Sequence, residues 1–335
     1  AGNRKTFTFS AWVKRSSLGR AVILGVATAV GSQESGIEFD GDIIRCYQYT
    51  GSFNFRIRTT NQYRDPSAWY HIVFALDTTQ ASSNNRAKLY VNGEQVTDLG
   101  ANEQPSQNLD VSFINTTTEH RIGQLAGSHK FDGYMAEINF IDGFQYDPSY
   151  FGETNALTGQ WNPKKYVGSY GSNGYYLNFL DNSGTTATTL GKDSSGNGNN
   201  FTPNNFSVSA GVGNDSLEDT PTNNFCTLNS ISLGQGNEQN TTFSNGNLDF
   251  SDSSSSNRAA ISTFGLKTGK WYYELTCTNN GVYSIGWYDM PNNGGSFYRN
   301  NGSYSSSFGG GGTFGYSSWT TNDVIGVAID FDSGK

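Results

Sequence analysis

The chain has 335 residues, which is enough for about two domains. Its net charge is −8 and only 15% of its residues are charged, so we expect no nucleic-acid binding by phosphate neutralisation. An aromatic content of 14% excludes generic disorder, and 41 glycines with many Asn, Ser and Thr argue against a helical protein. No apolar run approaches the roughly 20 residues of a membrane-spanning helix, so we expect no membrane insertion.

Short apolar runs separated by turn residues predict many β-strands. Residues 7–14 alternate between apolar and polar, which predicts a half-buried strand. Residues 21–26 are continuously apolar and predict a buried strand, and residues 69–76 predict a longer one. The dipeptide Asn92-Gly93 lies between two apolar runs and predicts a hairpin, because both turn residues need positive φ.

The later part of the chain continues this pattern, which is interrupted once by a polar stretch. Residues 134–141 and 175–179 predict two further strands. A polar stretch over 211–221 has little periodicity and predicts a linker between a first domain, 1–210, and a second, 222–335. Many strands with Gly-rich turns predict an all-β chain of two tandem antiparallel β-sandwiches.

The cysteines of this chain predict neither disulfides nor a metal centre. Cys46, Cys226 and Cys277 are far apart and odd in number, so they form no disulfide framework. The three histidines are dispersed, and no Cys/His spacing matches a zinc site. We therefore expect the chain to fold without covalent or metal staples between its cysteines.

The first predicted domain resembles the LamG family of concanavalin A-like lectins. Several segments match that family in order and spacing, among them the predicted strands and the Asn-Gly turn described above. The matching segments are residues 6–14, 69–73, 89–93, 131–137 and 190–202. The resemblance implies a jelly-roll sandwich over 1–210.

The second predicted domain resembles a SPRY domain, which is also a β-sandwich. The resemblance is carried by residues 269–274, 285–287 and 323–331. A LamG-like and a SPRY-like domain in tandem, this rich in Asn and Ser, are similar to virion proteins of marine tailed phages. Both families normally have one more strand at the outer end of these segments, so we expect this chain to be part of a longer polypeptide.

The lectin-like fold also includes glycoside hydrolases, whose family motif is Glu-x-Asp-x-Glu on one strand. Glu38, Asp40 and Asp42 have the right spacing, but the last acid is Asp and a glycine precedes it. The segment that starts at Glu137 has Asn139 in place of the middle acid. Because a retaining glycosidase needs two carboxylates about 5–5.5 Å apart, we predict no catalytic residues.

One polar loop is a candidate calcium site. Asp193, Asn197 and Asn199 are separated by two glycines that permit tight curvature, and their side chains offer the oxygen ligands that Ca²⁺ prefers. The loop has one carboxylate, so a site would need an acid from another segment. The alternative is an Asx-rich turn whose side chains cap their own backbone.

An aromatic, Ser/Gly/Asn-rich segment near the end of the chain predicts a surface loop that contacts glycans. Such mixtures suit adaptable binding loops, and aromatic faces pack on sugar rings. The candidate contact residues are Tyr298, Tyr304, Phe308, Tyr316 and Trp319. The alternative is a solvated loop with some of these rings in the core.

Together these observations predict a non-catalytic protein of the virion surface, a tail fibre or a capsid decoration, that adheres to host-surface glycans. Its expected partners are other virion proteins and copies of itself, because low charge and many β edges favour homo-oligomers. Two alternatives stay open: a glycan-degrading depolymerase and a secreted cellular lectin. Paired carboxylates in a cleft would favour the first, and a set of disulfides would favour the second.

Overall fold

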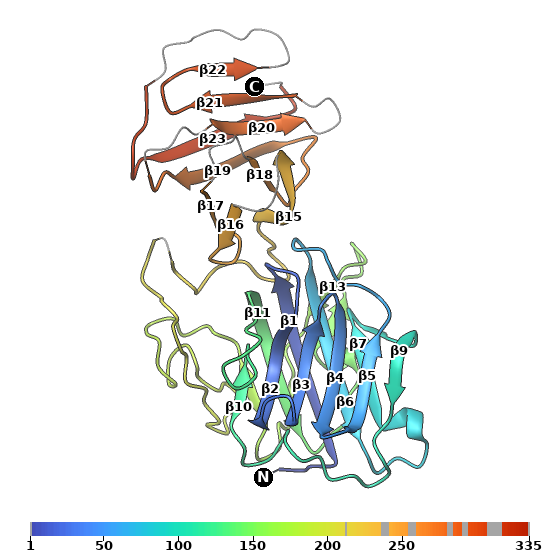
Figure 1. Cartoon of the computed structure of the whole chain (residues 1–335). Coiled ribbons are helices and arrows are strands. Elements are labelled where there is room, and N and C mark those ends of the chain that lie inside the picture. The colour runs from blue at the N-terminus through green and yellow to red at the C-terminus, as the bar shows by residue number, and fades with distance from the viewer. Residues whose placement is uncertain are drawn as a thin grey trace. The chain divides into compact units, whose positions relative to one another are not determined.

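The structure is a computed structural model that divides into two compact units, Ala1–Phe264 and Gly265–Lys335 (Figure 1). The described residues are 2–211, 213–235, 241–253, 259–279, 284–289, 294–306 and 317–333. Within them the helical elements are two 3-10 turns, η1 (Ser83–Asn85) and η2 (Pro148–Tyr150). The strands pair antiparallel throughout these ranges, which confirms the predicted all-β fold. No helix among them is long and apolar enough to cross a membrane.

The first unit is built around two six-stranded sheets that pack face to face, as in a jelly-roll sandwich (Figure 1). Sheet A, in spatial order, consists of β14 (Tyr175–Leu177), β11 (Gly133–Asp142), β1 (Thr6–Arg15), β6 (Trp69–Asp77), β7 (Ala87–Val91) and β8 (Glu94–Gln95). Sheet B consists of β10 (His120–Ile122), β2 (Ala21–Ala29), β3 (Gln33–Asp40), β4 (Ile43–Thr50), β5 (Phe53–Thr59) and β9 (Leu99–Glu103).

Three short two-stranded pairs complete the first unit. They are β12 (Gly152–Thr154) with β13 (Trp161–Pro163), β15 (Leu228–Gln235) with β18 (Ala259–Ser262), and β16 (Thr241–Ser244) with β17 (Asp249–Asp252). The unit therefore continues past residue 210 and includes the segment 211–221.

The core lies between the two sheets and follows the alternation of the strands. Tyr70, Ile72, Phe74 and Leu76 of β6 all point into it, as their spacing predicts. The turn between β7 and β8 is also as predicted, since Asn92 has φ of 51° and the glycine after it has φ of 87°. These local patterns are sufficient to set which face of sheet A meets sheet B.

Strand β1 is buried on both faces, so the prediction of a half-buried strand is wrong. Every residue after Thr6 in this strand is buried, including Thr8, Ser10, Trp12 and Lys14 on the polar face. The reason is a second layer of chain on the outer face of sheet A. Phe151 and Tyr166 pack there against apolar residues of β6 and β11, and residues 219–225 cover the end of β1.

The second unit contains two small antiparallel sheets. One pairs β19 (Lys270–Thr276) with β23 (Val324–Asp330), and the other contains β20 (Ser284–Asp289), β21 (Gly294–Arg299) and β22 (Tyr304–Ser306). A small core forms around Cys277, Ile285 and Trp319. Tyr298 lies in β21 and Tyr304 in β22, so the segment that the sequence suggested as a loop contains paired strands.

We predict that Phe74→Ala destabilises the first unit by about 3–5 kcal/mol, because truncation leaves a cavity in the sandwich core. The Phe74 ring contacts Phe7 of its own sheet at 6.2 Å and stacks on Phe55 of the opposite sheet at 5.9 Å, both between ring centroids. Urea unfolding measures the change. Leu180→Ala is the control, since this side chain is 80% exposed and its loss should change stability by less than about 0.5 kcal/mol.

Candidate functional site

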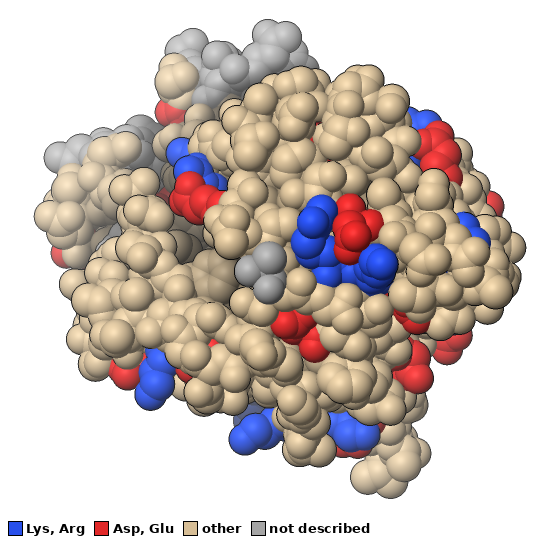
Figure 2. Space-filling model, turned by 90° about the horizontal axis from the view of Figure 1, so that it is seen from below, with Lys and Arg blue, Asp and Glu red and all other residues tan. Residues whose placement is uncertain are grey.

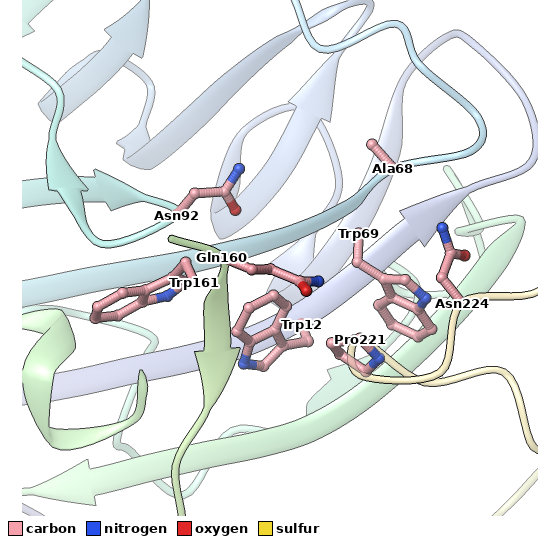
Figure 3. Close-up of a pocket in the computed structure, with 8 residues that line it drawn as sticks. All are labelled: Trp12, Ala68, Trp69, Asn92, Gln160, Trp161, Pro221 and Asn224. Carbon is pink, nitrogen blue, oxygen red and sulfur yellow. The ribbon is translucent and has the colours of Figure 1, made fainter. Parts of the chain in front are cut away.

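A pocket of about 390 Å³ lies on the outer face of sheet A, at the ends of β1 and β6 (Figure 3). The residues that line it are Trp12, Ala68, Trp69, Asn92, Gln160, Trp161, Pro221 and Asn224. Figure 3 shows the indole rings beside β1, with Pro221 and Asn224 on one side and Gln160 and Trp161 on the other. Five segments that are separate in the sequence therefore meet at this pocket.

Alternation along the strands directs two of the indoles into the pocket. Trp12 and Trp69 occupy positions whose neighbours, Val13 and Tyr70, point into the sandwich core. The third indole, Trp161, comes from β13 and needs room close to the backbone. A Cβ atom at Gly152 would lie only 2.4 Å from Trp161 Cζ2, so glycine at that position lets the ring pack flat.

A buried histidine contacts two of the indoles. The imidazole of His71 stacks on Trp12 with a centroid distance of 4.7 Å and an interplanar angle of 13°. Its Nδ1 edge faces Trp161, whose ring lies 6.0 Å away between centroids, at 27°. The Trp161 Nε1–H group donates a 2.9 Å hydrogen bond to His71 Nδ1, which fixes both rings.

The hydrogen bonds of His71 also define its protonation state. An indole N–H can only donate, so Nδ1 must be the unprotonated nitrogen and Nε2 carries the hydrogen. That hydrogen is donated to Ser10 Oγ across 2.9 Å. Burial lowers the pKa of His71 to about 3, so the ring is neutral at physiological pH.

The opposite wall of the pocket is held by a buried ion pair. Lys14 Nζ lies 2.8 Å from Asp219 Oδ2, and both side chains are almost inaccessible to solvent. The other oxygen of Asp219 accepts a 2.9 Å hydrogen bond from Trp69 Nε1. Asn224 Nδ2 donates to the Ser67 carbonyl oxygen at 2.7 Å. Residues 219–225, the strap, are thereby fixed on the outer face of sheet A.

The pocket is electrically neutral. All eight lining residues are uncharged, and the one cation beneath the strap, Lys14, is compensated by Asp219. The face shown in Figure 2 is mostly uncharged as well, with acidic and basic side chains often side by side. Indole faces and amide groups can stack on an apolar ring and exchange hydrogen bonds with hydroxyl groups.

The acids that resemble a glycosidase motif are paired with three arginines. Glu38 is fully buried and accepts hydrogen bonds from Arg45 and from Arg20, the latter at 3.1 Å. Asp40 pairs with Arg45 at 2.9 Å, and Asp42 pairs with Arg64 at 2.6 Å. All three acids are therefore engaged in ion pairs.

Glu137 occupies a bulge of β11, opposite the register shift between Ser10 and Trp12 of β1, and has φ of 51°. Its Oε2 atom accepts a 2.6 Å hydrogen bond from the Tyr176 hydroxyl.

The structure brings the three candidate calcium ligands together in one hydrogen-bonded loop. Asp193 is buried, and its two oxygens accept hydrogen bonds from the backbone nitrogens of Ser195 and Asn199 at 2.8 and 2.9 Å. The amides of Asn197 and Asn199 donate to the Gly174 carbonyl oxygen. Across the described ranges, no group of three His, Cys, Asp or Glu side chains could hold a metal. Calcium binding stays a prediction that depends on a further acid.

The candidate aromatic contacts of the second unit are only partly described, since Phe308 and Tyr316 lie outside the described residues. Tyr298 and Trp319 pack edge to face at 4.7 Å between centroids, and Trp319 is 7% exposed. These two rings contribute to the small core, which is the alternative that the sequence left open. Tyr304 is half-buried on β22.

Sequence reasoning missed the tryptophan pocket. A signal for it exists, because Trp12 and Trp69 occupy the strand face opposite the core, where large indoles are not expected to face solvent. Strand alternation could not predict that Trp161, Pro221 and Asn224 also line the pocket, since their positions depend on contacts between distant segments.

Comparison with known proteins supports the lectin-like fold of the first domain. Residues 2–143 match the family model of the concanavalin A-like lectin/glucanases superfamily, of the laminin G type. The LamG resemblance of the first domain is thereby supported. No curated protein sequence matches the chain.

Two solved structures are similar to part of the chain. One is domain 4 of a GH43 extracellular arabinanase from Geobacillus stearothermophilus, in complex with arabinotriose, with 17% identity over 43% of this chain and 64% of that chain and a TM-score of 0.32. The other is tailspike protein 2 of Escherichia coli O157:H7 bacteriophage CAB120, with 11% identity over 45% of this chain and 21% of that chain and a TM-score of 0.29. The chain spans less than two thirds of the length of each.

We predict that acid destabilises the first unit partly through His71. Its pKa is about 3 in the folded state and about 6.5 in an unfolded chain, so the unfolded state binds the extra proton. This contribution is complete above about pH 6.5 and is lost toward pH 3, at up to about 1.4 kcal/mol per pH unit.

Unfolding free energies of the wild type and His71→Gln, measured from pH 7 to pH 4, test this expectation. The variant should show a shallower loss of stability. His120, whose pKa burial also lowers, is present in both proteins and cancels in the comparison. Parallel pH profiles for the two proteins would contradict the prediction.

Proposed function

We propose that the chain is a non-catalytic carbohydrate-binding protein whose tryptophan pocket binds a neutral glycan. The observation that carries this proposal is the half-buried indole of Trp161, beside the buried indoles of Trp12 and Trp69, with the exposed amide side chains of Asn92, Gln160 and Asn224 around one pocket. Sugar rings have apolar C–H faces that pack on indoles, and their hydroxyl groups need donors and acceptors of the amide type.

The dimensions and rigidity of the pocket fit this role. Its volume of about 390 Å³ lies within the range of about 300–1,000 Å³ that is usual for small-molecule sites. Trp12 and Trp69 are held by the sheet, and Trp161 is held by its hydrogen bond to His71. Binding would therefore cost little ordering of side chains.

The absence of charge among the lining residues favours neutral over acidic sugars. A carboxylated or sulfated glycan would lose hydration in this pocket without gaining a cationic partner, since Lys14 already pairs with Asp219. The net charge of −8 also disfavours the approach of polyanionic chains.

We extend the proposal to the virion surface, where the protein would act as a tail fibre or a capsid decoration and adhere to host glycans. This extension is supported by the tandem resemblance to LamG-like and SPRY-like domains of tailed-phage proteins and by the abundance of Asn and Ser. Assembly with copies of itself and with other virion proteins belongs to the same proposal. A secreted cellular lectin would bind glycans through the same pocket. Detection of the protein on a phage particle would distinguish the virion role from this alternative.

We expect Trp161→Ala to weaken binding of neutral oligosaccharides at least tenfold, or about 1.4 kcal/mol, because it removes one stacking face of the pocket. A glycan array followed by titration calorimetry measures the effect. Phe144→Ala is the matched control, since this ring is 44% exposed but does not line the pocket, and it should bind as the wild type does. Equal loss in both variants, or binding restricted to acidic glycans, would refute the pocket assignment.

We also expect no glycan cleavage. The eight lining residues include no carboxylate, and Glu38 and Asp40 are engaged by arginines. A glycosidase of either stereochemistry needs two carboxylic groups beside the scissile bond. Incubation with host capsule, lipopolysaccharide and laminarin-type glucans should release no reducing ends. Release that Glu38→Gln abolishes would instead establish the depolymerase alternative.

A further inference from the structure

Lys14 is a buried amine surrounded by three oxygen acceptors. Its side chain is 0% exposed, and its Nζ atom lies 2.8 Å from Asp219 Oδ2, 2.8 Å from Asn224 Oδ1 and 2.7 Å from the Phe225 carbonyl oxygen. Cγ of Asn224 is one covalent bond from the oxygen that the amine contacts. The amine is thus in direct contact with both a carboxylate and an amide.

The cluster is almost closed to solvent. Lys14 Nζ lies 5.4 Å from the centre of the Tyr134 ring, and the Trp69 indole N–H group donates to Asp219. Removal of an ammonium and a carboxylate from water is costly for both ions. Transfer of one proton from Lys14 to Asp219, across their 2.8 Å contact, gives a neutral amine and a neutral acid. A neutral lysine amine is nucleophilic.

We propose that Lys14 and Asn224 form an intramolecular isopeptide bond and that Asp219 is the catalytic acid and base for the step. Lys14 Nζ attacks Asn224 Cγ, a C–N bond forms, and the bond from Cγ to Nδ2 breaks. Asp219 gives the proton that it took from the ammonium group to the leaving nitrogen, which departs as ammonia. Asp219 then takes the second proton of the attacking nitrogen, so that the new amide keeps one hydrogen and the acid ends protonated. The step needs no oxidant, reductant or further reactant.

The orientation of Asn224 fits this direction of attack. Its Nδ2 atom donates to the Ser67 carbonyl oxygen at 2.7 Å, so the amide presents its carbonyl oxygen to the lysine and its leaving nitrogen away from it. Asp219 is itself oriented by hydrogen bonds from Trp69 Nε1 and the Phe225 backbone nitrogen. Reacting groups held in contact in this way gain a large advantage in rate over free ones.

The bond would staple the strap to sheet A. Residues 14 and 224 are 210 positions apart, so the link would join β1 to the segment that follows the whole sandwich. Such a covalent closure limits the freedom of the unfolded chain in the same way as a disulfide, in a protein whose cysteines are free.

Intact-mass measurement of the purified full chain tests the proposal. The wild type should be lighter than the mass of its sequence by one molecule of ammonia, and tandem mass spectrometry of a digest should identify one branched peptide that contains Lys14 and Asn224. The branched peptide is essential, because a succinimide at an Asn-Gly sequence loses the same mass but joins no second peptide.

Three variants should retain the full mass: Lys14→Arg, Asp219→Ala and Asn224→Ala. Asn224→Ala is the most informative, since it keeps the pair between Lys14 and Asp219 and should fold, as circular dichroism can verify. Asn223→Ala is the matched control and should form the branched peptide as the wild type does. A wild type with full mass, or a mass loss that persists in Lys14→Arg, would overturn the proposal.

Discussion

The buried amine of Lys14 is the constraint on which the outer face of sheet A depends. An ammonium group inside a protein is tolerated only with good acceptors for its hydrogens, and β1 itself supplies none of them. The three acceptors come from residues 219–225, which follow the sandwich in sequence. Asp219 also receives the indole hydrogen of Trp69, so the same carboxylate satisfies two polar groups of sheet A. The strap must therefore lie across this sheet, and one wall of the pocket is formed as a result.

His71 has the corresponding role for the other wall. Its neutral ring donates to Ser10 on the neighbouring strand β1 and accepts from Trp161, and the second bond is satisfied only while β13 lies over β6. Lys14 and His71, two of the polar residues of the buried face, thus recruit different segments to the same sheet. If this face were purely apolar, the position of the two segments on the sheet would be less well defined, because apolar contacts are not directional. The pocket is the space that these two recruited segments leave between them.

Sequence reasoning was sufficient for the strands and for the face that each presents to the core. Alternation in β6 and the turn at Asn92 depend on neighbours in the chain, which is why they could be predicted. The partner of Lys14 could not, since Asp219 lies 205 residues away in a stretch without periodicity. The alternation of polar residues in β1 predicted that one face of the strand is exposed to solvent. That face is instead buried by segments far away in the sequence, which no local pattern in β1 could have predicted. Tyr298 illustrates the same limit, because its place in β21 depends on pairing with β22.

The position of the pocket on sheet A keeps its tryptophan side chains rigid. The indoles of Trp12 and Trp69 stand on strands whose opposite faces are fixed in the sandwich core, so they cannot rearrange without disturbing that core. Preformed stacking faces reduce the ordering cost of binding, which matters most for sugars, whose many hydroxyl groups gain little net free energy when they leave water. Specificity must then come from the more exposed amides of Asn92, Gln160 and Asn224. If Asn224 is joined to Lys14, its carbonyl oxygen remains an acceptor at the edge of the pocket but its amino group is lost. The covalent state of the strap would therefore change which hydroxyl donors and acceptors the pocket can satisfy, and would couple the stability of the sheet to the choice of glycan.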